Sequence, residues 1–303
     1  MKQFSRVSGA LSARLSAADL AAIVDLLDSG DRAALQAVQS DPIERARVML
    51  HLGAHYRVPE VLEKTGLSAA TPPESIHSMG RGSLAAGGSM YYADLVIGAL
   101  EQVGAELPPA AAILDFGCSS GRVIRVLKAY NAAYNCYGCD PNGEAIGWAQ
   151  QNLPGIDFRI SPLRPPLSYA PGHFDLLFAI SIWSHMNQKS ARGWLAEMRR
   201  IVKAGGLFLL TFHGLSSVSY YTTNRLHDPH LMQRMRGNLL RKGFSFFDRF
   251  GKSGDWGVRD SEWGEAYMSL RWLEENTKND WQCLYYQAGL VEGNQDLAVL
   301  RAQ

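Results

Sequence analysis

The stretch ILDFGCSSGR, residues 113–122, decides the fold of this chain. It continues a short apolar run, Ala111–Phe116, which predicts a buried strand. Gly117 and Gly121 follow in the turn after that strand, and glycine lets a backbone adopt positive φ and approach a ligand closely. Arg122–Tyr130 then predicts a helix. A strand, a glycine-bearing turn and a helix in this order indicate an open α/β sheet that binds its ligand at the carboxyl ends of its strands.

The same rhythm continues towards the C-terminus. The predicted strands and helices after the first unit are Tyr134–Cys139, Glu144–Asn152, Ile156–Ile160, Phe174–Ile180, Ala191–Val202 and Leu207–Phe212, and two final strands are Trp281–Gln287 and Leu297–Arg301. Alternating strands and helices predict a parallel sheet with helices on both faces. The second strand ends in Asp140, whose carboxylate suits the paired hydroxyls of a ribose.

Two segments lie outside this alternation. Residues 1–88 predict an N-terminal helical cap, which leaves 89–303 as the core domain. Residues 215–279 predict an insertion before the last two strands, with a helix at Ser261–Glu275. The insertion is basic and aromatic; its residues of these kinds are Arg234, Arg236, Arg241, Lys242, Phe244, Phe246, Phe247, Arg249, Phe250 and Lys252. This composition fits either a contact with an anionic or membrane surface or a lid helix with a solvated face, and we adopt the lid.

Composition excludes several classes of protein. The chain has 303 residues, of which 47% are hydrophobic, so it can bury a core and is not disordered throughout. Lys and Arg number 30 against 29 Asp and Glu, a net charge of +1, which disfavours a protein built for nucleic acid. Four cysteines make no disulfide framework, and no apolar run reaches the ~20 residues of a membrane span. No secretion signal is evident, so a cytoplasmic location is expected.

The glycine loop carries a specific resemblance. Gly117-x-x-x-Gly121 is neither the dinucleotide fingerprint G-x-G-x-x-G nor a phosphate loop with Gly-Lys-Ser/Thr. Asp115–Gly121 resembles motif I, D/E-x-G-x-G-x-G, of the Rossmann-like S-adenosylmethionine-dependent methyltransferases, with Ser119 in place of the middle glycine. Phe174–Ser181 resembles the fourth-strand motif of that family. Ile201–Leu210 resembles its L-K-P-G-G turn into the fifth strand, with Ala204 replacing the proline.

The resemblance implies a fold and a cofactor. The fold is a seven-stranded, mostly parallel, doubly wound α/β sheet with an antiparallel last strand. The cofactor is S-adenosylmethionine, with S-adenosylhomocysteine as the product. The positions that match the family's cofactor-binding motifs, or follow its strands, are Asp115, Gly117, Cys118, Ser119, Gly121, Asp140, Pro141, Ser161, Leu163 and Ser181.

The chemistry of methyl transfer defines the remaining candidates. Transfer from a sulfonium is an in-line displacement, which needs a base only if the acceptor loses a proton. The catalytic candidates are His185, His213 and Tyr92, each with a structural alternative in packing or hydrogen bonding. The candidate substrate-binding residues are Tyr91, Trp183, Trp256, Glu262, Trp263 and Tyr267, where aromatic rings and a carboxylate could surround a cation or simply pack in the core.

The acceptor stays open at this stage. A small molecule under a roof of cap and insertion is the main hypothesis, methylated on a hydroxyl, an amine or a thioether such as that of methionine. The alternatives are a non-catalytic regulatory subunit that binds S-adenosylmethionine, and a methyltransferase that acts on a glycan, a lipid or nucleic acid. Cys136-x-x-Cys139 has no second pair, so no metal is expected.

Overall fold

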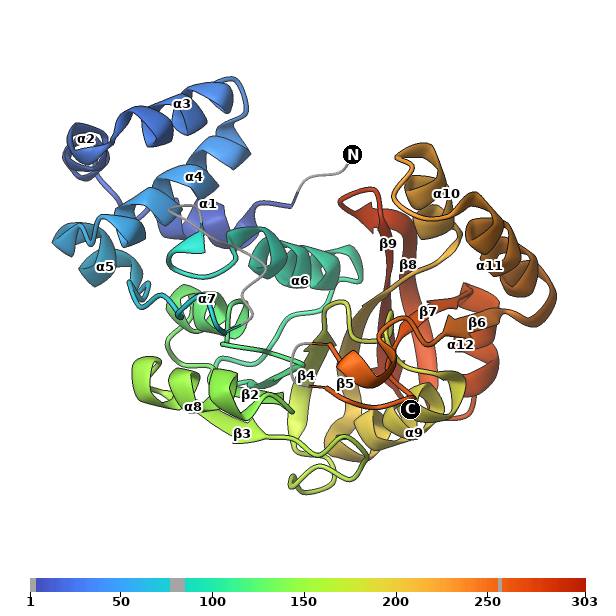
Figure 1. Ribbon diagram of the computed structural model, residues 1–303. Helices are drawn as coiled ribbons and strands as arrows, with labels where there is room; N and C mark the ends of the chain where they lie inside the picture. Colours follow the sequence, from blue (N-terminus) through green and yellow to red (C-terminus); the bar gives the residue numbers. More distant parts are fainter. Residues whose placement is uncertain (1–3, 77–84, 256–257) are drawn as a thin grey trace. The chain divides into compact units, whose positions relative to one another are not determined.

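The computed structural model describes residues 4–76, 85–255 and 258–303 (Figure 1). Its backbone divides into two compact units. The first unit combines residues 112–117 with residues 160–303, and the second combines the residues before 112 with residues 118–159. The sequence-based boundary at residue 88 stays a prediction.

Seven strands form one mixed sheet in the order β3-β2-β1-β4-β5-β9-β8. The strands are β1 (Ala112–Phe116), β2 (Asn135–Asp140), β3 (Ile156–Ile160), β4 (Phe174–Ala179), β5 (Val202–Phe212), β8 (Trp281–Val291) and β9 (Gln295–Ala302). β1, β4 and β5 run parallel, and the chain-terminal strand β9 lies antiparallel between β5 and β8. The predicted fold class is therefore confirmed.

The first unit holds the parallel strands at a fixed register. Leu114 pairs with Leu177, which in turn pairs with Phe208, and all three side chains are fully buried. Runs of large apolar residues suit strands that are covered on both faces. The helix α9 (Gln188–Ile201) follows β4 and starts at Asn187, whose side chain accepts a hydrogen bond from the Ser190 N–H at 2.9 Å.

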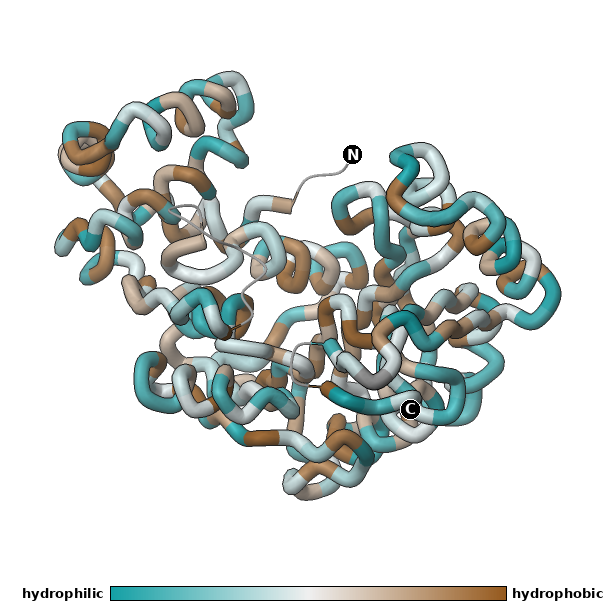
Figure 2. Tube along the Cα trace, viewed as in Figure 1, coloured by the Kyte–Doolittle hydropathy of each residue, from teal (hydrophilic) through white to brown (hydrophobic). Residues whose placement is uncertain are grey.

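The insertion of the first unit mixes helices with a small sheet of its own. It comprises α10 (Leu215–Thr223), α11 (Pro229–Lys242), β6 (Phe244–Phe247), η2 (Gly251–Ser253), β7 (Glu265–Met268) and α12 (Leu270–Thr277). In Figure 2 polar and apolar residues alternate along α11, and Met232, Met235 and Leu239 are its buried residues.

The helix expected at Ser261–Glu275 is wrong in its first half. Glu265–Met268 forms β7 and pairs antiparallel with β6, Phe244 opposite Met268. The helix α12 starts only after Ser269, whose hydroxyl accepts from the Trp272 N–H at 3.2 Å. All four residues of β7 are buried, so the segment has no polar alternation to mark it as a strand.

The second unit contains the N-terminal helices together with β2 and β3. Its helices are α1 (Arg6–Ser12), α2 (Ala17–Leu26), α3 (Ser29–Ala37), α4 (Pro42–His55), α5 (Pro59–Thr65), α6 (Met90–Gln102), α7 (Ile124–Tyr130) and α8 (Gly143–Asn152). Asp94 on α6 is fully buried and joins three of these elements. Its carboxylate accepts from the Val7 and Ser8 N–H groups of α1 at 2.8 and 2.9 Å and pairs with Arg47 of α4 at 2.9 Å. A fully satisfied buried carboxylate of this kind fixes the arrangement of the helices around it.

Within the described residues, no single helix has the length and apolar composition to cross a bilayer. One pair, α1 with α2, meets that test only jointly and is bent by 96°.

Candidate cofactor and acceptor site

The glycine loop has three residues with positive φ. The angles are 80° at Gly117, 49° at Ser119 and 75° at Gly121. Ser119 stands where the resembled motif has its middle glycine, and its backbone still adopts the left-handed conformation that glycine favours. A non-glycine residue there is strained by about 1–2 kcal/mol. The loop therefore keeps glycine-like geometry at a position that has lost its glycine.

Neither glycine leaves room for a side chain. A Cβ at Gly121 would lie 2.7 Å from Cζ of Phe158, within the second unit. A Cβ at Gly117 would lie 2.1 Å from Cδ1 of Ile182, within the first unit. Both distances are shorter than carbon atoms tolerate, so packing as well as φ requires glycine at both ends of the loop.

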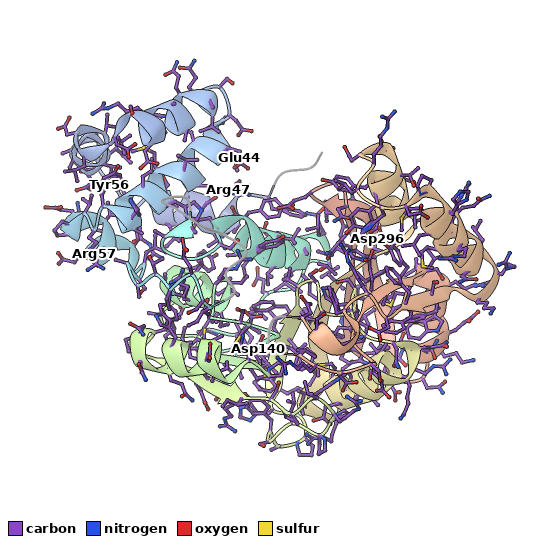
Figure 3. The ribbon with its side chains drawn as sticks, in the orientation of Figure 1. Glu44, Arg47, Tyr56, Arg57, Asp140 and Asp296 are labelled. Atoms are coloured by element: carbon purple, nitrogen blue, oxygen red, sulfur yellow. The ribbon has the colours of Figure 1, made fainter. Side chains whose placement is uncertain are left out.

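Asp140 braces the loop from the end of β2 (Figure 3). Its Oδ2 accepts from the Ser119 N–H at 2.8 Å, and its Oδ1 accepts from the Asn142 N–H at 2.8 Å. A carboxylate has about four lone-pair sites, so each oxygen can accept a further hydroxyl hydrogen. Burial raises the pKa of Asp140, and the two N–H donors oppose that rise. This chemistry fits the paired hydroxyls of a ribose.

The second unit contains four further candidates. The Cys118 N–H donates to the Cys139 carbonyl at 3.1 Å, and the Cys118 side chain is buried. Pro141 is half-buried and precedes Asn142, the N-cap of α8. Tyr91 and Tyr92 lie edge to face with ring centroids 5.0 Å apart. The cofactor-binding, substrate-binding and catalytic roles expected for these residues stay predictions.

Ser181, directly after β4, is held by a polar cluster of the first unit. Its N–H donates to the Thr211 hydroxyl at 2.7 Å, and its hydroxyl accepts from Nε2 of Gln295 at 2.7 Å. The Ser181 backbone has a φ of 63°. Thr211 and Gln295 were not among the predicted site residues, because they lie on β5 and β9 and only the sheet brings them to Ser181.

His185 is a neutral imidazole in a defined tautomer. Its Nδ1 lies 3.0 Å from the Gly264 carbonyl oxygen, which can only accept, so Nδ1 carries the hydrogen. Burial lowers the pKa of His185, which keeps the ring neutral at physiological pH. Trp263 stacks on the ring with centroids 4.8 Å apart and an interplanar angle of 18°. Nε2 is consequently the unprotonated nitrogen that can accept a proton.

His213 lies in a second buried group. Its Nε2 is 3.1 Å from the Tyr221 hydroxyl oxygen, which also accepts from Nδ2 of Asn294 at 3.3 Å. Burial, and then the nearby His185 and His227, lower the pKa of His213 to about 3. The ring is therefore neutral and serves as a hydrogen-bond partner.

Glu265 anchors a network that the sequence did not reveal. The side chain is almost fully buried, and its Oε2 pairs with Arg249 at 2.7 Å. Its Oε1 lies 3.2 Å from Nε2 of His227 and accepts a hydrogen bond from the Tyr267 hydroxyl. Burial and the adjoining carboxylate raise the pKa of Tyr267. These residues come from separate segments of the insertion, so no spacing rule joins them.

Backbone hydrogen bonds tie the insertion to the segments that follow β4 and β5. The Gly264 N–H donates to the His185 carbonyl, the Ala266 N–H to that of Ser184, and the Met268 N–H to that of His213, each at 2.8 Å. The insertion therefore covers the carboxyl ends of β4 and β5, where the sequence placed the acceptor-contacting residues.

The other candidates of the first unit are enclosed to different degrees. Trp183 is a core residue, 1% exposed and packed against Phe116 and Phe208 with ring centroids 5.9 and 5.2 Å away. Tyr267 is fully buried, Asp115 and Ser161 are buried, and Leu163 is exposed. Trp183 and Tyr267 thus face no opening in this structure.

Two predicted substrate residues are occupied by other contacts. Glu262 accepts from the Ser190 hydroxyl and pairs with Arg164 at 3.2 Å. Trp263 donates its Nε1–H to Asp255 at 3.0 Å. Trp256 lies outside the described residues.

Comparison with known proteins identifies the core. Residues 113–206 match a family model described as a methyltransferase domain. The chain carries a methyltransferase domain. The matched stretch begins in the strand before the glycine loop and includes the loop and fourth-strand motifs that resemble the Rossmann-like, S-adenosylmethionine-dependent class.

The curated relatives match only in part. A 2-methyl-6-phytyl-1,4-hydroquinone methyltransferase of Synechocystis is 28% identical over 107 residues, which are 34% of this chain and 32% of the relative. An uncharacterised methyltransferase of the same organism is 26% identical over 104 residues, which are 34% of this chain and 48% of the relative. The chain thus spans less than half the length of either relative.

Solved structures of methyltransferases are also similar to this chain. A methyltransferase of Methanosarcina mazei is 21% identical, with a TM-score of 0.45 over 65% of this chain and 92% of that chain. A magnesium protoporphyrin IX methyltransferase of Synechocystis, solved with bound S-adenosylhomocysteine, is 16% identical, with a TM-score of 0.45 over 70% and 82% of the two chains. The fold of the methyltransferase domain itself rests on the strand order of this chain.

Proposed function

We propose that this protein transfers a methyl group from S-adenosylmethionine to a small-molecule acceptor. The observation that carries the proposal is the cover that the insertion makes over the ends of β4 and β5. Three alternate residues of the insertion, Gly264, Ala266 and Met268, donate backbone hydrogen bonds to carbonyls after these strands. A covered site excludes water and favours a small acceptor over a polymer.

The residues of the loop fit the cofactor. S-adenosylmethionine, when bound, supplies a methyl group on an electrophilic sulfonium. Gly117 and Gly121 adopt the positive φ that a tight turn at a cofactor site requires, and Asp140 keeps lone pairs for ribose hydroxyls. Ser181, fixed by Thr211 and Gln295, presents a polar group after β4.

Among acceptors, we propose a hydroxyl, with His185 as the general base. A hydroxyl loses its proton on methylation, and the neutral His185 has an unprotonated Nε2 to receive it. One curated relative is named for a hydroquinone, which is a small-molecule acceptor. His213 and Tyr92 stay weaker catalytic predictions, because His213 Nε2 already meets Tyr221.

The test is an assay with methyl-labelled S-adenosylmethionine against small-molecule, lipid and polymer fractions of a cell extract. Label in a neutral product of low mass supports methylation of a hydroxyl, and a cationic product points to an amine or a thioether. His185→Gln should lower kcat by about 10²–10⁴ while the affinity for S-adenosylhomocysteine stays unchanged. Label only in lipid or polymer contradicts the proposal, and intact cofactor binding with no label in any fraction favours a regulatory subunit.

A further inference from the structure

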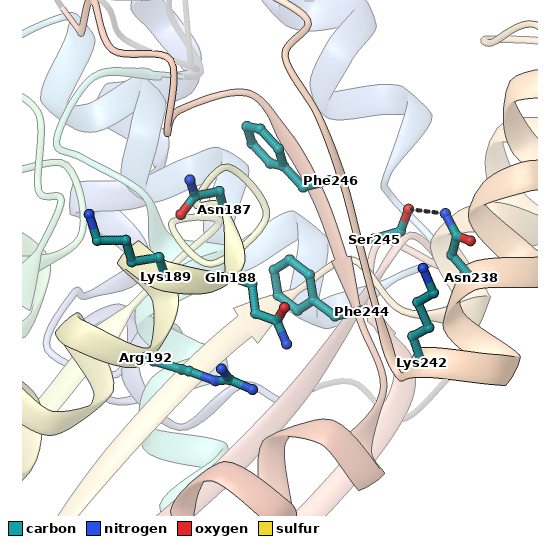
Figure 4. Close-up of a pocket in the computed structure, with 9 residues that line it drawn as sticks. All are labelled: Asn187, Gln188, Lys189, Arg192, Asn238, Lys242, Phe244, Ser245 and Phe246. Atoms are coloured by element: carbon teal, nitrogen blue, oxygen red, sulfur yellow. Dashed lines mark hydrogen bonds between the residues drawn. The ribbon is translucent and has the colours of Figure 1, made fainter.

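A pocket of about 660 Å³ lies on the first unit, at the side of the insertion (Figure 4). Its lining combines three cations, three amides, one hydroxyl and two aromatic rings. The residues are Lys189, Arg192, Lys242, Asn187, Gln188, Asn238, Ser245, Phe244 and Phe246. No carboxylate is among these described lining residues. The volume is within the ~300–1,000 Å³ of ordinary small-molecule sites.

Two helices supply the cations that line the pocket. Lys189 and Arg192 are three residues apart on α9, a spacing that places both on one helix face. Lys242 ends α11 on the other side of the pocket, and Figure 4 shows the β6 residues Phe244 and Phe246 between the two groups. The three cations thus line the pocket from two helices and not from a flexible loop.

No carboxylate among the described residues forms an ion pair with Arg192. Its Nε donates to the Asn276 amide oxygen at 2.7 Å, and its guanidinium lies over the Trp272 ring at 5.9 Å. The hydrogen-bond network orients the Gln188 amide so that its oxygen accepts from Nη2 of Arg192 at 3.1 Å. All of these partners are neutral, so they position the guanidinium fork and leave its charge available.

The two lysines add to the excess of positive charge at the pocket. The ion pairs found among the described residues do not include Lys242. Lys189 meets one carboxylate, Glu262 at 3.4 Å, and Glu262 is shared with Arg164 at 3.2 Å. Three cations therefore face one carboxylate that lies outside the lining and already serves another guanidinium. An anion in the pocket would relieve the repulsion among them.

The aromatic residues Phe244 and Phe246 indicate which kind of anion the pocket would bind. Phe244 is buried against Trp272 with ring centroids 4.7 Å apart, while Phe246 is half-buried. An apolar, flat part of a ligand can lie against such a ring, and an arginine fork binds phosphate oxygens in pairs. We propose that this pocket binds a small organic phosphate, with its phosphate between Arg192 and Lys242 and its apolar part against Phe246. This inference depends on the pocket alone and not on the proposed methyl transfer.

The test uses phenyl phosphate and inorganic phosphate as probes in calorimetric titrations of the full chain. Phenyl phosphate should bind more tightly than inorganic phosphate, and Phe246→Ala should remove most of that difference. Arg192→Gln and Lys242→Gln should each weaken phenyl phosphate about tenfold, which corresponds to about 1.4 kcal/mol. The matched control is Lys278→Gln, an exposed residue after α12 that removes the same charge outside the lining and should leave affinity unchanged.

Several outcomes would overturn the inference. Equal losses in Lys278→Gln and Arg192→Gln would mean attraction by net charge and no built site. Phenyl phosphate could fail to bind while a fluorescein-labelled oligonucleotide or phosphatidic acid vesicles bind in an Arg192-dependent way. The pocket would then be part of a polymer or membrane contact. Titration of S-adenosylhomocysteine into each variant, with far-UV circular dichroism, separates these results from misfolding and from failure of the methyltransferase assignment.

Discussion

The glycine loop and the insertion differ in the kind of interaction that defines their structure. In the loop, backbone geometry dominates: three positive φ angles and a carboxylate that keeps lone pairs for a ligand. Around the insertion, side chains dominate: Glu265 and His213 are buried, His185 is half-buried, and all three contact partners from other segments. The loop therefore keeps hydrogen-bonding capacity for a ligand, whereas much of the insertion pairs its polar groups with one another.

The largest expected effect is a loss of stability when the buried carboxylate of the insertion is neutralised. Glu265→Gln removes the charge that contacts His227, Arg249 and Tyr267, and it leaves these donors without their anion. Buried hydrogen-bonding groups that lose a charged partner cost about 2–3 kcal/mol, so the free energy of unfolding in urea should fall by about that amount.

The control for this variant is Glu275→Gln, which breaks an exposed ion pair with Arg271 and should cost less than about 1 kcal/mol. Equal small losses in both variants would show that the Glu265 network contributes no more than a surface pair.

The next effect tests whether packing or φ restricts the loop. Gly117→Ala places a Cβ against Ile182 and should destabilise the fold by about 1–3 kcal/mol. Ile182→Ala removes the clash but not the strain of a positive φ, so the double variant should recover only part of the loss. The measurement is a double-mutant cycle of unfolding free energies. A coupling energy near zero would contradict the steric account.

A third test concerns pH. Burial lowers the pKa of His213 to about 3, against about 6.5 in an unfolded chain, so the folded protein binds fewer protons. Stability from this residue is present above pH 6.5 and is lost as the pH falls from 6.5 towards 3. The slope is up to about 1.4 kcal/mol per pH unit.

His213→Gln should therefore flatten the fall in stability between pH 6.5 and pH 4, measured by urea denaturation at each pH. The same steepness in wild type and variant would mean that the buried ring takes up its proton without cost.

The smallest effect returns to the loop. Ser119→Gly restores the middle glycine of the motif and removes a strained φ of 49°, which should stabilise the fold by up to about 1 kcal/mol. Greater freedom in the unfolded chain offsets part of this gain. A thermal melt detects the change, and cofactor affinity should stay the same. A loss of stability would show that the serine side chain makes contacts that outweigh the strain.

The same comparison explains what the sequence could predict. The order of strands and the glycine loop follow from local alternation and from residues within one strand–turn–helix unit, so both were predicted. The Gly264 carbonyl that fixes the His185 tautomer lies 79 residues away, and no spacing rule joins the two. Gln295, which fixes Ser181, lies 114 residues away.

The basic segment of the insertion shows the limit most clearly. Its composition was visible, but the cations of the proposed phosphate pocket come from α9 as well as from α11. Phe244–Phe247 forms a strand, where a lid helix was expected, and the strand is what turns Phe244 and Phe246 to the same side. Long-range pairing of β6 with β7 decided this, and pairing of that kind leaves little trace in a single sequence.

The central claim is that Asp140 holds the ribose of the cofactor, and calorimetric titration of S-adenosylhomocysteine tests it most directly. The proteins are wild type, Asp140→Ala and the control Asp157→Ala, which removes an exposed carboxylate of the same unit. Hydrogen bonds to a charged group contribute about 1.5–3 kcal/mol each, so Asp140→Ala should weaken binding at least about tenfold while its circular dichroism stays that of a folded protein. Near-normal affinity in a folded Asp140→Ala, equal to that of Asp157→Ala, would contradict the account.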